Sequence, residues 1–328
     1  MNVTADNAYI RVENLKKYFN TKGGMLHAVD DVSFSVNRGE TLGLVGESGC
    51  GKSTLGRCMI KLLPSTAGKV LLHSGSGGGY FDITQASGHQ MNELRKRVQI
   101  VFQDPYSCLN PRLSVWELIA EPLIVNKVYS SKKEMQKRVL ELMDTVGLAE
   151  RLNNSYPHEL DGGRRQRIGI ARSLALNPEF IVLDEPVSAL DVCIQAQILN
   201  LLNDLQQEFF YTYVFISHNL SVVKHVSDRI AVMYLGKIVE LTDYRELFAN
   251  PMHPYTLALL SAIPVAKLDV KKERILLEGD VGSPIEPPEG CRFAGRCREA
   301  GEVCRIKTPE LREISPGHFV SCHFRNGK

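Results

Sequence analysis

Short apolar runs alternate along this chain with stretches in which apolar residues recur at helical spacing. Four of the runs are predicted to form buried strands, at residues 41–46, 180–185, 213–218 and 229–235. A helix is expected to begin near Lys52, directly after the first run. Another helix follows the second run, and its apolar stripe consists of Ile194, Ile198, Leu201, Leu202 and Leu205. Buried strands separated by helices are typical of a parallel sheet covered on both faces, so we predict an α/β fold.

From about residue 105 to residue 177 the pattern changes to helices alone. One apolar face in this stretch consists of Met135, Val139, Leu142, Met143 and Val146. We therefore predict a helical subdomain inserted at about residues 105–177. Prolines become frequent after about residue 250, which indicates an appended, loop-rich segment. The expected domains are residues 1–250, which contain the insertion, and residues 251–328.

The charges of the chain are nearly balanced, with 39 lysines and arginines, 37 aspartates and glutamates, and a formal net charge of +2. Bulk charge therefore favours neither nucleic acid nor lipid as a partner. The N-terminal residues lack the basic start and apolar core of a signal peptide, and no apolar run has the length of a membrane span. We expect a protein that docks to a membrane if it acts there. Its eight cysteines are then expected to be thiols or metal ligands rather than disulfides.

Residues 46–53, GESGCGKS, match the phosphate-binding pattern G-x-x-x-x-G-K-[ST] between a predicted strand and a predicted helix. Glycines allow backbone N–H groups to turn inward around phosphates, and the N-terminus of the helix adds favourable partial charge. Lys52 is expected to reach the β- and γ-phosphates, and Ser53 is expected to bind Mg²⁺. Since a chance glycine turn seldom has this form, the sequence predicts a nucleoside triphosphate site.

A second part of this site is predicted where the run 180–185 ends in two acids. Asp184 is expected to organise Mg²⁺, and Glu185 is expected to orient a water molecule. A strand that ends in Asp-Glu is common and carries little weight alone. Together with the phosphate-binding loop at residues 46–53, it indicates hydrolysis of a nucleoside triphosphate.

Six short motifs follow one another along the chain: GESGCGKST, IVFQD, LDGGRRQR, FIVLDEP, SALD and VFISH. In this order they resemble the motifs of the ATP-binding cassette (ABC) ATPases, over residues 9–245. The resemblance implies a P-loop NTPase (RecA-like) core with an antiparallel β subdomain, a helical insertion, and a small loop-rich C-terminal cysteine domain. It also implies ATP and Mg²⁺ as cofactors, and two cassettes that close on each other around two ATP molecules.

The resemblance implies roles for individual residues. Glu185 is similar to the catalytic base, with Lys52 beside the phosphates. His218 is similar to the histidine that contacts the γ-phosphate. Gln103 is similar to the glutamine that joins the helical insertion to the Mg²⁺ site. Residues 188–191 resemble the loop through which two cassettes communicate.

The resemblance also implies which residues contact the nucleotide and its metal. Tyr18 lies where the family stacks an aromatic ring on adenine, with Phe19 or simple core packing as the alternatives. The implied contacts to ATP are Tyr18, Gly46, Glu47, Ser48, Gly49, Cys50, Gly51, Lys52, Ser53, Thr54 and Gln103. The implied Mg²⁺ ligands are Ser53, Gln103 and Asp184.

Residues 160–164 read LDGGR where the family normally has LSGGQ. The resemblance implies that Gly162, Gly163 and the following helix N-terminus donate N–H groups to an ATP held by a second cassette. A serine would donate a hydrogen bond there, whereas an ionised Asp161 can only accept one. Two like unit charges about 4 Å apart repel by roughly 4 kcal/mol at an effective dielectric constant of 20. Arg164, Mg²⁺ or a rotamer turned away would offset part of this repulsion.

The charge of Asp161 therefore predicts a weakened ATP site at the partner cassette. A heterodimer with unequal sites follows, in which a homologous, non-identical ABC ATPase subunit supplies an LSGGQ-like loop to this chain. The alternative is that Asp161 is tolerated in a slower homodimer, or that it reflects an altered sequence.

Four cysteines lie near the C-terminal end, at Cys291, Cys297, Cys304 and Cys322. Such a cluster of thiolates suits zinc or an iron–sulfur cluster, and the spacing matches neither the C-x₂-C zinc ribbons nor the ferredoxin runs. The chemistry alone leaves the metal undecided.

Three stretches around these cysteines, ANPMHPYTLALLSAIP, GSPIEPPEGCRFAGRC and GHFVSCHF, resemble the C-terminal extension of the oligopeptide/dipeptide-importer subgroup of ABC ATPases. The resemblance implies that the four cysteines hold a [4Fe–4S] cluster. Zinc and inert thiols remain the alternatives, and His318 or His323 could replace a ligand.

The expected function is that of an ATP-hydrolysing subunit of an ABC importer of the peptide type, peripheral at the cytoplasmic face of the cell membrane. The implied partners are a second ABC ATPase subunit, two membrane permease subunits and, indirectly, a substrate-binding protein. One alternative is a soluble ABC ATPase of a metalloenzyme-activating or assembly complex. Another is an ATP-binding regulatory subunit that does not hydrolyse ATP. A nucleic-acid partner is not expected, because the chain has no basic stripe and no long coiled-coil insertion.

Overall fold

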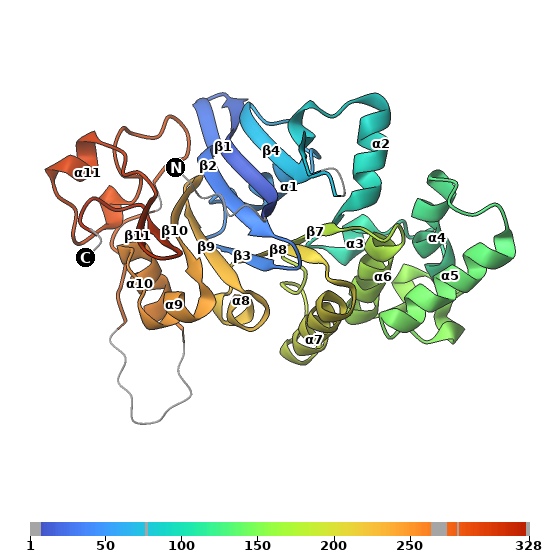
Figure 1. The fold of residues 1–328 in the computed structure, drawn as a ribbon. Helices are drawn as coiled ribbons and strands as arrows, with labels where there is room; N and C mark the ends of the chain where they lie inside the picture. The colour runs from blue at the N-terminus through green and yellow to red at the C-terminus, as the bar shows by residue number, and fades with distance from the viewer. Residues whose placement is uncertain (1–7, 76–77, 264–273, 281, 326–328) are drawn as a thin grey trace. The chain divides into compact units, whose positions relative to one another are not determined.

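The computed structural model describes residues 8–75, 78–263, 274–280 and 282–325 (Figure 1). The chain divides into two compact units. The first unit consists of residues 1–85 and 215–328, and the second of residues 86–214. Strand β8 (Thr212–Ser217) carries the chain from the second unit back into the first.

The first unit contains an antiparallel sheet of four strands, in the order β2-β1-β4-β5. Its strands are β1 (Ala8–Thr21), β2 (Gly24–Asn37), β4 (Ala67–His73) and β5 (Tyr80–Asp82), and a 3-10 turn, η1 (Ile83–Gln85), follows. The long β1–β2 hairpin and its neighbour β4 are drawn in blue in Figure 1. This sheet confirms the antiparallel β subdomain that the family resemblance implies.

The first unit also contains a parallel pair of strands, one of which leads into the glycine-rich loop of residues 46–51. Strand β3 (Thr41–Val45) pairs in parallel with β9 (Arg229–Tyr234), and every residue of β3 is buried. Helix α1 (Lys52–Met59) follows β3, and helix α8 (Leu220–Val226) precedes β9. The predicted strands at 41–46 and 229–235 are therefore confirmed. They could be recognised in the sequence because a strand that is buried on both faces requires a continuous run of apolar residues.

The segment after residue 250 adds two strands to this sheet, which the sequence pattern did not predict. Strand β10 (Lys237–Asp243) pairs antiparallel with β9 on one side and with β12 (His318–Val320) on the other, and β12 pairs with β11 (Arg312–Ser315). The remaining elements of this part are α9 (Tyr244–Ala249), α10 (Pro254–Ser261), η4 (Ala294–Arg296) and α11 (Glu302–Ile306). The expected domain boundary at residue 250 stays a prediction.

A buried polar contact accompanies the pairing of β10 with β12. The His318 Nε2 atom lies 2.7 Å from the Glu240 Oε1 atom, and both side chains are 0% exposed. The Glu240 carboxylate also accepts hydrogen bonds from the backbone N–H groups of Met252 and His253. A buried carboxylate of this kind is tolerated only when its oxygens are hydrogen-bonded, as they are here.

The second unit combines two parallel strands with a helical segment. Strands β6 (Val98–Val101) and β7 (Phe180–Asp184) pair in parallel, which confirms the predicted strand at 180–185. The helices are α2 (Gly88–Arg97), α3 (Pro105–Cys108), α4 (Val115–Val125), α5 (Lys132–Thr145), α6 (Gly162–Leu174) and α7 (Val192–Phe209), with 3-10 turns η2 (Glu150–Leu152) and η3 (Pro157–Glu159). The predicted apolar face on α5 is buried at Val139, Leu142 and Met143.

Local sequence signals explain where the helices of the second unit begin. Helix α4 starts with a capping box, in which the Ser114 hydroxyl accepts from the Glu117 N–H and the Glu117 carboxylate accepts from the Ser114 N–H. Such caps satisfy N–H groups that the helix itself leaves without partners.

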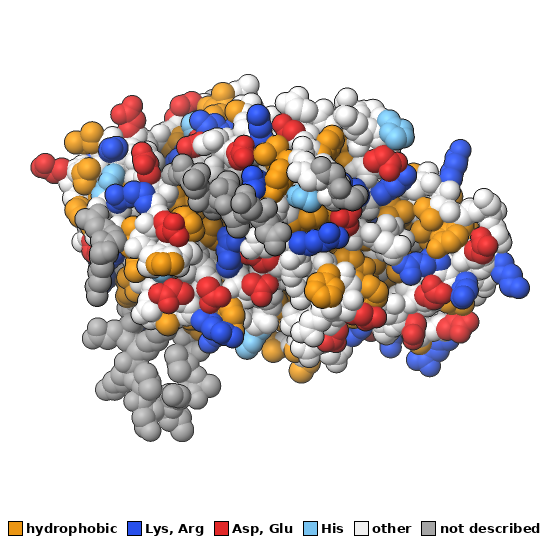
Figure 2. Space-filling view, viewed as in Figure 1, with side chains coloured by type: hydrophobic (Ala, Val, Ile, Leu, Met, Phe, Trp, Pro, Cys, Tyr) orange, Lys and Arg blue, Asp and Glu red, His pale blue; other side chains and the backbone are white. Residues whose placement is uncertain are grey.

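None of the helices in the described ranges combines the length and apolar character required to cross a bilayer. Figure 2 shows acidic and basic side chains interspersed over one face of the molecule, as the nearly balanced composition leads one to expect.

Candidate functional site

The phosphate-binding loop follows β3, and its glycines have backbone conformations that other residues rarely adopt. Gly46, Gly49 and Gly51 have φ values of 156°, 79° and 106°. A Cβ atom at Gly46 would lie 2.1 Å from the Met233 carbonyl oxygen, and one at Gly51 would lie 2.0 Å from the Ala28 carbonyl oxygen. At Gly49 a Cβ atom would meet nothing within 4 Å. The loop is therefore packed against β2 and β9 at its two ends and open at Gly49.

Lys52 begins helix α1 and is folded over this loop. Its side chain is buried, and its Nζ atom donates to the carbonyl oxygens of Gly46 at 2.8 Å and Glu47 at 3.0 Å. No side chain caps the N-terminus of α1, where Gly51 is the cap residue. A buried ammonium beside a helix N-terminus without a side-chain cap suits the negative charge of a phosphate chain. These residues therefore fit the predicted triphosphate.

The predicted catalytic acids lie at the end of β7 in the second unit. Asp184 is 1% exposed, and Glu185 follows it with a positive φ of 49°. The Gln103 Nε2 atom donates to the Glu185 Oε2 atom at 3.0 Å. The backbone carbonyl of Glu185 accepts from the Ser188 hydroxyl at 3.1 Å. The structure thus brings Gln103 and Glu185 together, and it holds Glu185 in a backbone conformation that few non-glycine residues adopt.

Asp161 lies at the N-terminus of helix α6 and caps it. Its Oδ1 atom accepts from the Arg164 N–H at 2.8 Å, and its Oδ2 atom lies 3.4 Å from the Arg164 Nε atom. Both side chains are about half exposed, at 59% for Asp161 and 46% for Arg164. The carboxylate is therefore turned toward its own helix, which is one of the arrangements expected to offset its charge.

The glycines that follow Asp161 pack against Leu190 and against helix α7. A Cβ atom at Gly163 would lie 2.6 Å from the Ile194 Cγ2 atom, and one at Gly162 would lie 3.2 Å from the Leu190 Cδ2 atom. Asp191 caps helix α7 through the Ile194 N–H at 3.0 Å. Glycine is required at position 163 because a side chain would collide with α7.

Two further predicted residues lie in the first unit. His218 is exposed directly after β8. The ring of Tyr18, on β1, stacks on His27 with a centroid distance of 4.0 Å, and its hydroxyl donates to Asp30. Burial and the hydrogen bond to Asp30 raise the pKa of Tyr18, so its hydroxyl stays neutral. One face of the Tyr18 ring is covered by His27, and its stacking on adenine stays a prediction.

The four C-terminal cysteines gather in space, yet the predicted metal centre is not supported. Among the residues that the structure describes, no group of three or more His, Cys, Asp or Glu residues is arranged to hold a metal ion. Burial, together with the neighbouring thiols Cys297, Cys304 and Cys322, raises the pKa of Cys291 to about 11. Metal ligation would require the Cys291 thiol to lose its proton.

The two histidines named as possible substitutes for a cysteine ligand have other partners. The ring of His318 contacts Glu240, and the His323 Nε2 atom lies 2.7 Å from the Lys307 carbonyl oxygen. The replacement of a cysteine ligand by either histidine stays a prediction.

Several contacts at the phosphate-binding loop were missed by the sequence analysis. The Arg296 guanidinium forms an ion pair with Glu47, and the Tyr255 hydroxyl accepts from the Glu47 N–H at 2.9 Å. Arg292 forms an ion pair with Asp30. The sequence does show these two arginines in CRFAGRC, between two cysteines. Their contacts were not predicted, because the stretch was interpreted only through its cysteines.

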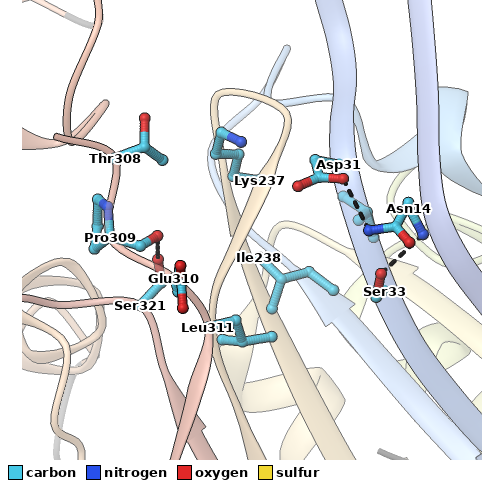
Figure 3. A pocket seen from close by; sticks show the side chains of 11 residues that line it. Asn14, Asp31, Ser33, Lys237, Ile238, Thr308, Pro309, Glu310, Leu311 and Ser321 are labelled. Atoms are coloured by element: carbon cyan, nitrogen blue, oxygen red, sulfur yellow. Dashed lines mark hydrogen bonds between the residues drawn. The ribbon is translucent and has the colours of Figure 1, made fainter. Parts of the chain in front are cut away.

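A cavity of about 280 Å³ in the first unit is bordered by the β1–β2 hairpin, by β10 and by the C-terminal segment. Figure 3 shows Asn14 and Asp31 on the hairpin side, Lys237 on β10, and Thr308 and Glu310 on the C-terminal side. The C-terminal segment therefore faces the same strands that carry Tyr18 and Asp30.

A second cavity, of about 210 Å³, lies within the second unit, and its lining comes from β6, α3, α4 and α6. Phe102, Cys108, Pro122 and Gln166 line it. Gln166 is 1% exposed, and its Nε2 atom has no hydrogen-bond partner among the described residues. A buried amide without a partner is costly, so the Gln166 side chain is a polar group that packing alone leaves unsatisfied.

Comparison with known proteins yields matches along most of the chain. The ABC transporter family matches residues 29–188, and the C-terminal region of the oligopeptide/dipeptide transporters matches residues 239–304. The chain is 51% identical over 324 residues to the oligopeptide transport ATP-binding protein AppF of Bacillus subtilis (strain 168), which covers 96% of each protein. It is 46% identical over 313 residues to a putative peptide import ATP-binding protein of Brucella ovis, which covers 95% of this chain and 96% of the relative.

Solved structures agree with these matches. The chain is similar to a dimeric ATP-binding cassette in a post-hydrolysis state bound to ADP and phosphate, with a TM-score of 0.64 and 30% sequence identity. The likeness covers 72% of this chain and 99% of that one.

Proposed function

This chain belongs to the ABC transporter family, as an ATP-binding subunit of the oligopeptide/dipeptide type, and we propose that it hydrolyses ATP to power peptide import through partner membrane subunits. The observation that carries the proposal is the 51% identity to an oligopeptide transport ATP-binding protein over 96% of the chain. This similarity extends through the cassette and the C-terminal segment. ATP hydrolysis itself follows from membership of the family.

We propose the following roles for the site residues in hydrolysis. Lys52 exchanges its carbonyl partners for the β- and γ-phosphates of ATP. Glu185, oriented by Gln103, aligns the attacking water and accepts its proton, and His218 contacts the γ-phosphate. Tyr18 stacks on adenine. Ser53, Gln103 and Asp184 would hold Mg²⁺, which would neutralise part of the phosphate charge.

The proposed membrane partners are two permease subunits, with a substrate-binding protein acting through them. The cavity of about 210 Å³ in the second unit is the proposed docking place for a short permease helix, at the cytoplasmic face of the membrane. The apolar part of its lining, which includes Phe102, Leu109 and Pro122, supports this choice, because a docked helix could cover these side chains.

The proposed ATPase partner is a second, non-identical cassette, and the two ATP sites of the pair are proposed to be unequal. A solved dimeric cassette supports the pairing by likeness. The charge of Asp161 supports the inequality, since a carboxylate stands where the LSGGQ pattern has a neutral hydroxyl. Its ion pair with Arg164 weakens this effect and does not remove the charge.

The four C-terminal cysteines are also proposed to bind a metal, as a [4Fe–4S] cluster or as zinc, after their side chains reorient. The support is that the four thiols lie close enough to influence one another's ionisation. The expected result is iron and sulfide, in a 1:1 ratio, in full-length protein purified without oxygen. Stoichiometric zinc would select the zinc alternative, and protein free of both would remove the proposal.

Co-purification tests the proposed transport function. We expect the chain, expressed with candidate membrane subunits and a second cassette, to purify as a complex whose ATPase activity rises when a peptide-loaded binding protein is added. Purification with a soluble enzyme complex instead, and without membrane subunits, would contradict the proposal and support the assembly alternative.

A further inference from the structure

The residues between Cys291 and Cys297 place two arginines against the strands and loop of the proposed ATP site. The Arg296 NH1 atom lies 2.8 Å from the Glu47 Oε2 atom, with side-chain exposures of 11% and 28%. Arg292 forms an ion pair with Asp30, with exposures of 6% and 14%. Both pairs lie within the first unit, and they join residues 249 and 262 positions apart in the sequence.

The segment between these cysteines is anchored by Phe293. This side chain is 2% exposed, and its ring lies 5.2 Å from Tyr234, 5.4 Å from Tyr255 and 5.6 Å from His253, measured between centroids. The turn η4 follows, closed by a hydrogen bond from the Arg296 N–H to the Phe293 carbonyl oxygen at 3.0 Å. A buried aromatic anchor and a closed turn limit the positions that Arg296 can take.

Arg296 acts on the residue that shapes the phosphate-binding loop. Glu47 follows Gly46, and its carbonyl oxygen accepts from the Lys52 Nζ atom at 3.0 Å. Its N–H donates to the Tyr255 hydroxyl, and its carboxylate pairs with Arg296. The side chain, N–H and carbonyl of Glu47 are thus each engaged, two of them by residues beyond position 250. Glu47 therefore links Arg296 to Lys52.

Arg292 acts on the strands that carry Tyr18. Its partner Asp30 lies on β2, accepts a hydrogen bond from the Tyr18 hydroxyl, and lies 3.4 Å from the Lys237 Nζ atom. Arg292 also donates to the Leu235 carbonyl oxygen, at the turn between β9 and β10. Because Tyr18, Asp30 and Arg292 are partly or fully buried, their contacts are less screened by solvent than surface ion pairs are.

We propose that Arg296 and Arg292 are positioning residues, through which the C-terminal segment holds the phosphate-binding loop and Tyr18 in the shape that binds ATP. Arg296 acts through Glu47, and Arg292 acts through Asp30. The inference rests on the proposed placement of ATP at residues 46–54. The C-terminal segment then contributes to the affinity for ATP, whether or not its cysteines bind a metal.

Substitution of Arg296 in the full-length protein tests this inference. We expect Arg296→Ala to raise the KM for ATP and the Kd of a fluorescent ATP analogue at least about fivefold, the lower end of typical coupling between sites, with kcat little changed. Arg296→Lys keeps the charge and is expected to restore most of the affinity. Arg298→Ala is the matched control, because Arg298 lies in the same segment, is 60% exposed, and forms its ion pair with Glu278, which is 84% exposed.

A double-mutant cycle with Glu47→Ala distinguishes an effect that passes through Glu47 from a general loss of stability in Arg296→Ala. When Glu47 is already alanine, adding Arg296→Ala is expected to cause no further loss of ATP affinity. An equal loss in both backgrounds would overturn the inference, because the effect would not pass through Glu47.

Lys52→Ala separates failure of this inference from failure of the nucleotide site. Unchanged ATP affinity in Arg296→Ala, with affinity lost in Lys52→Ala, would overturn the positioning role and leave the site in place. Unchanged affinity in both variants would overturn the site itself, and the inference with it.

Discussion

Replacing Glu185 by glutamine is expected to lower kcat for ATP hydrolysis about 10²- to 10⁴-fold, the range that a positioned general base typically contributes. Glutamine has nearly the same shape, so the contact with Gln103 can persist in altered form, but it cannot accept the proton of the attacking water. ATP binding is expected to remain, because the phosphate-binding loop is unchanged. Phosphate release and equilibrium binding of ATP, measured on the assembled transporter, separate the two effects.

Glu141→Gln is the matched control for Glu185→Gln. Glu141 lies on α5 in the same unit and is 50% exposed. Its neutralisation is expected to leave both turnover and ATP binding unchanged. Turnover in Glu185→Gln equal to that of the unaltered chain would contradict the assignment of Glu185 as the base. Loss of ATP binding together with turnover would instead point to a structural role for its carboxylate.

Neutralising Asp161 is expected to raise ATP turnover of the assembled cassettes by about 5- to 30-fold, which corresponds to roughly one or two kcal/mol. The full repulsion of about 4 kcal/mol is discounted because the side chain is exposed and lies beside Arg164. The gain belongs to the ATP held by the partner cassette, so it is measured as phosphate release with the partner present.

Asparagine and serine at position 161 distinguish charge from helix capping. Both residues are good N-caps, so Asp161→Asn and Asp161→Ser remove the charge while keeping a cap for α6. An alanine there would remove the cap and cost about 0.5–2 kcal/mol of stability, which makes it a poor test. Asp144→Asn, at an exposed site on α5, is the control for charge loss in the same unit. If turnover in the partnered Asn and Ser variants matched the parent, the proposed inequality between the two sites would be wrong.

The residues that form the C-terminal ion pairs lie in the region that matches the family of oligopeptide/dipeptide transporters. The matched C-terminal region of the oligopeptide/dipeptide transporters covers residues 239–304, which include Tyr255, Arg292 and Arg296. These three residues reach the loop and strands that precede residue 55. The appended segment is therefore expected to affect ATP affinity in addition to any role of its cysteines.

Much of the fold and of the candidate site could be predicted from the sequence. Strands β3, β7 and β9 were predictable because a fully buried strand requires a continuous apolar run. The loop at Gly46, Gly49 and Gly51 was predictable because its backbone angles admit little but glycine. The antiparallel sheet of β1, β2, β4 and β5 came only from the family resemblance, since its strands mix buried and exposed positions irregularly.

The sequence by itself determined the features that depend on neighbouring residues: the glycine conformations, the apolar strands, the helical face of α5 and the acids that end β7. Only the tertiary structure decided the partners that lie far apart in the chain. The pairing of Glu47 with Arg296, of Asp30 with Arg292, and of β10 with β12 depends on packing of distant segments, and no short-range pattern encodes it. The direction of the Asp161 carboxylate was likewise open, because one side chain could have faced either its own helix or a partner, and the geometry of α6 selects the helix.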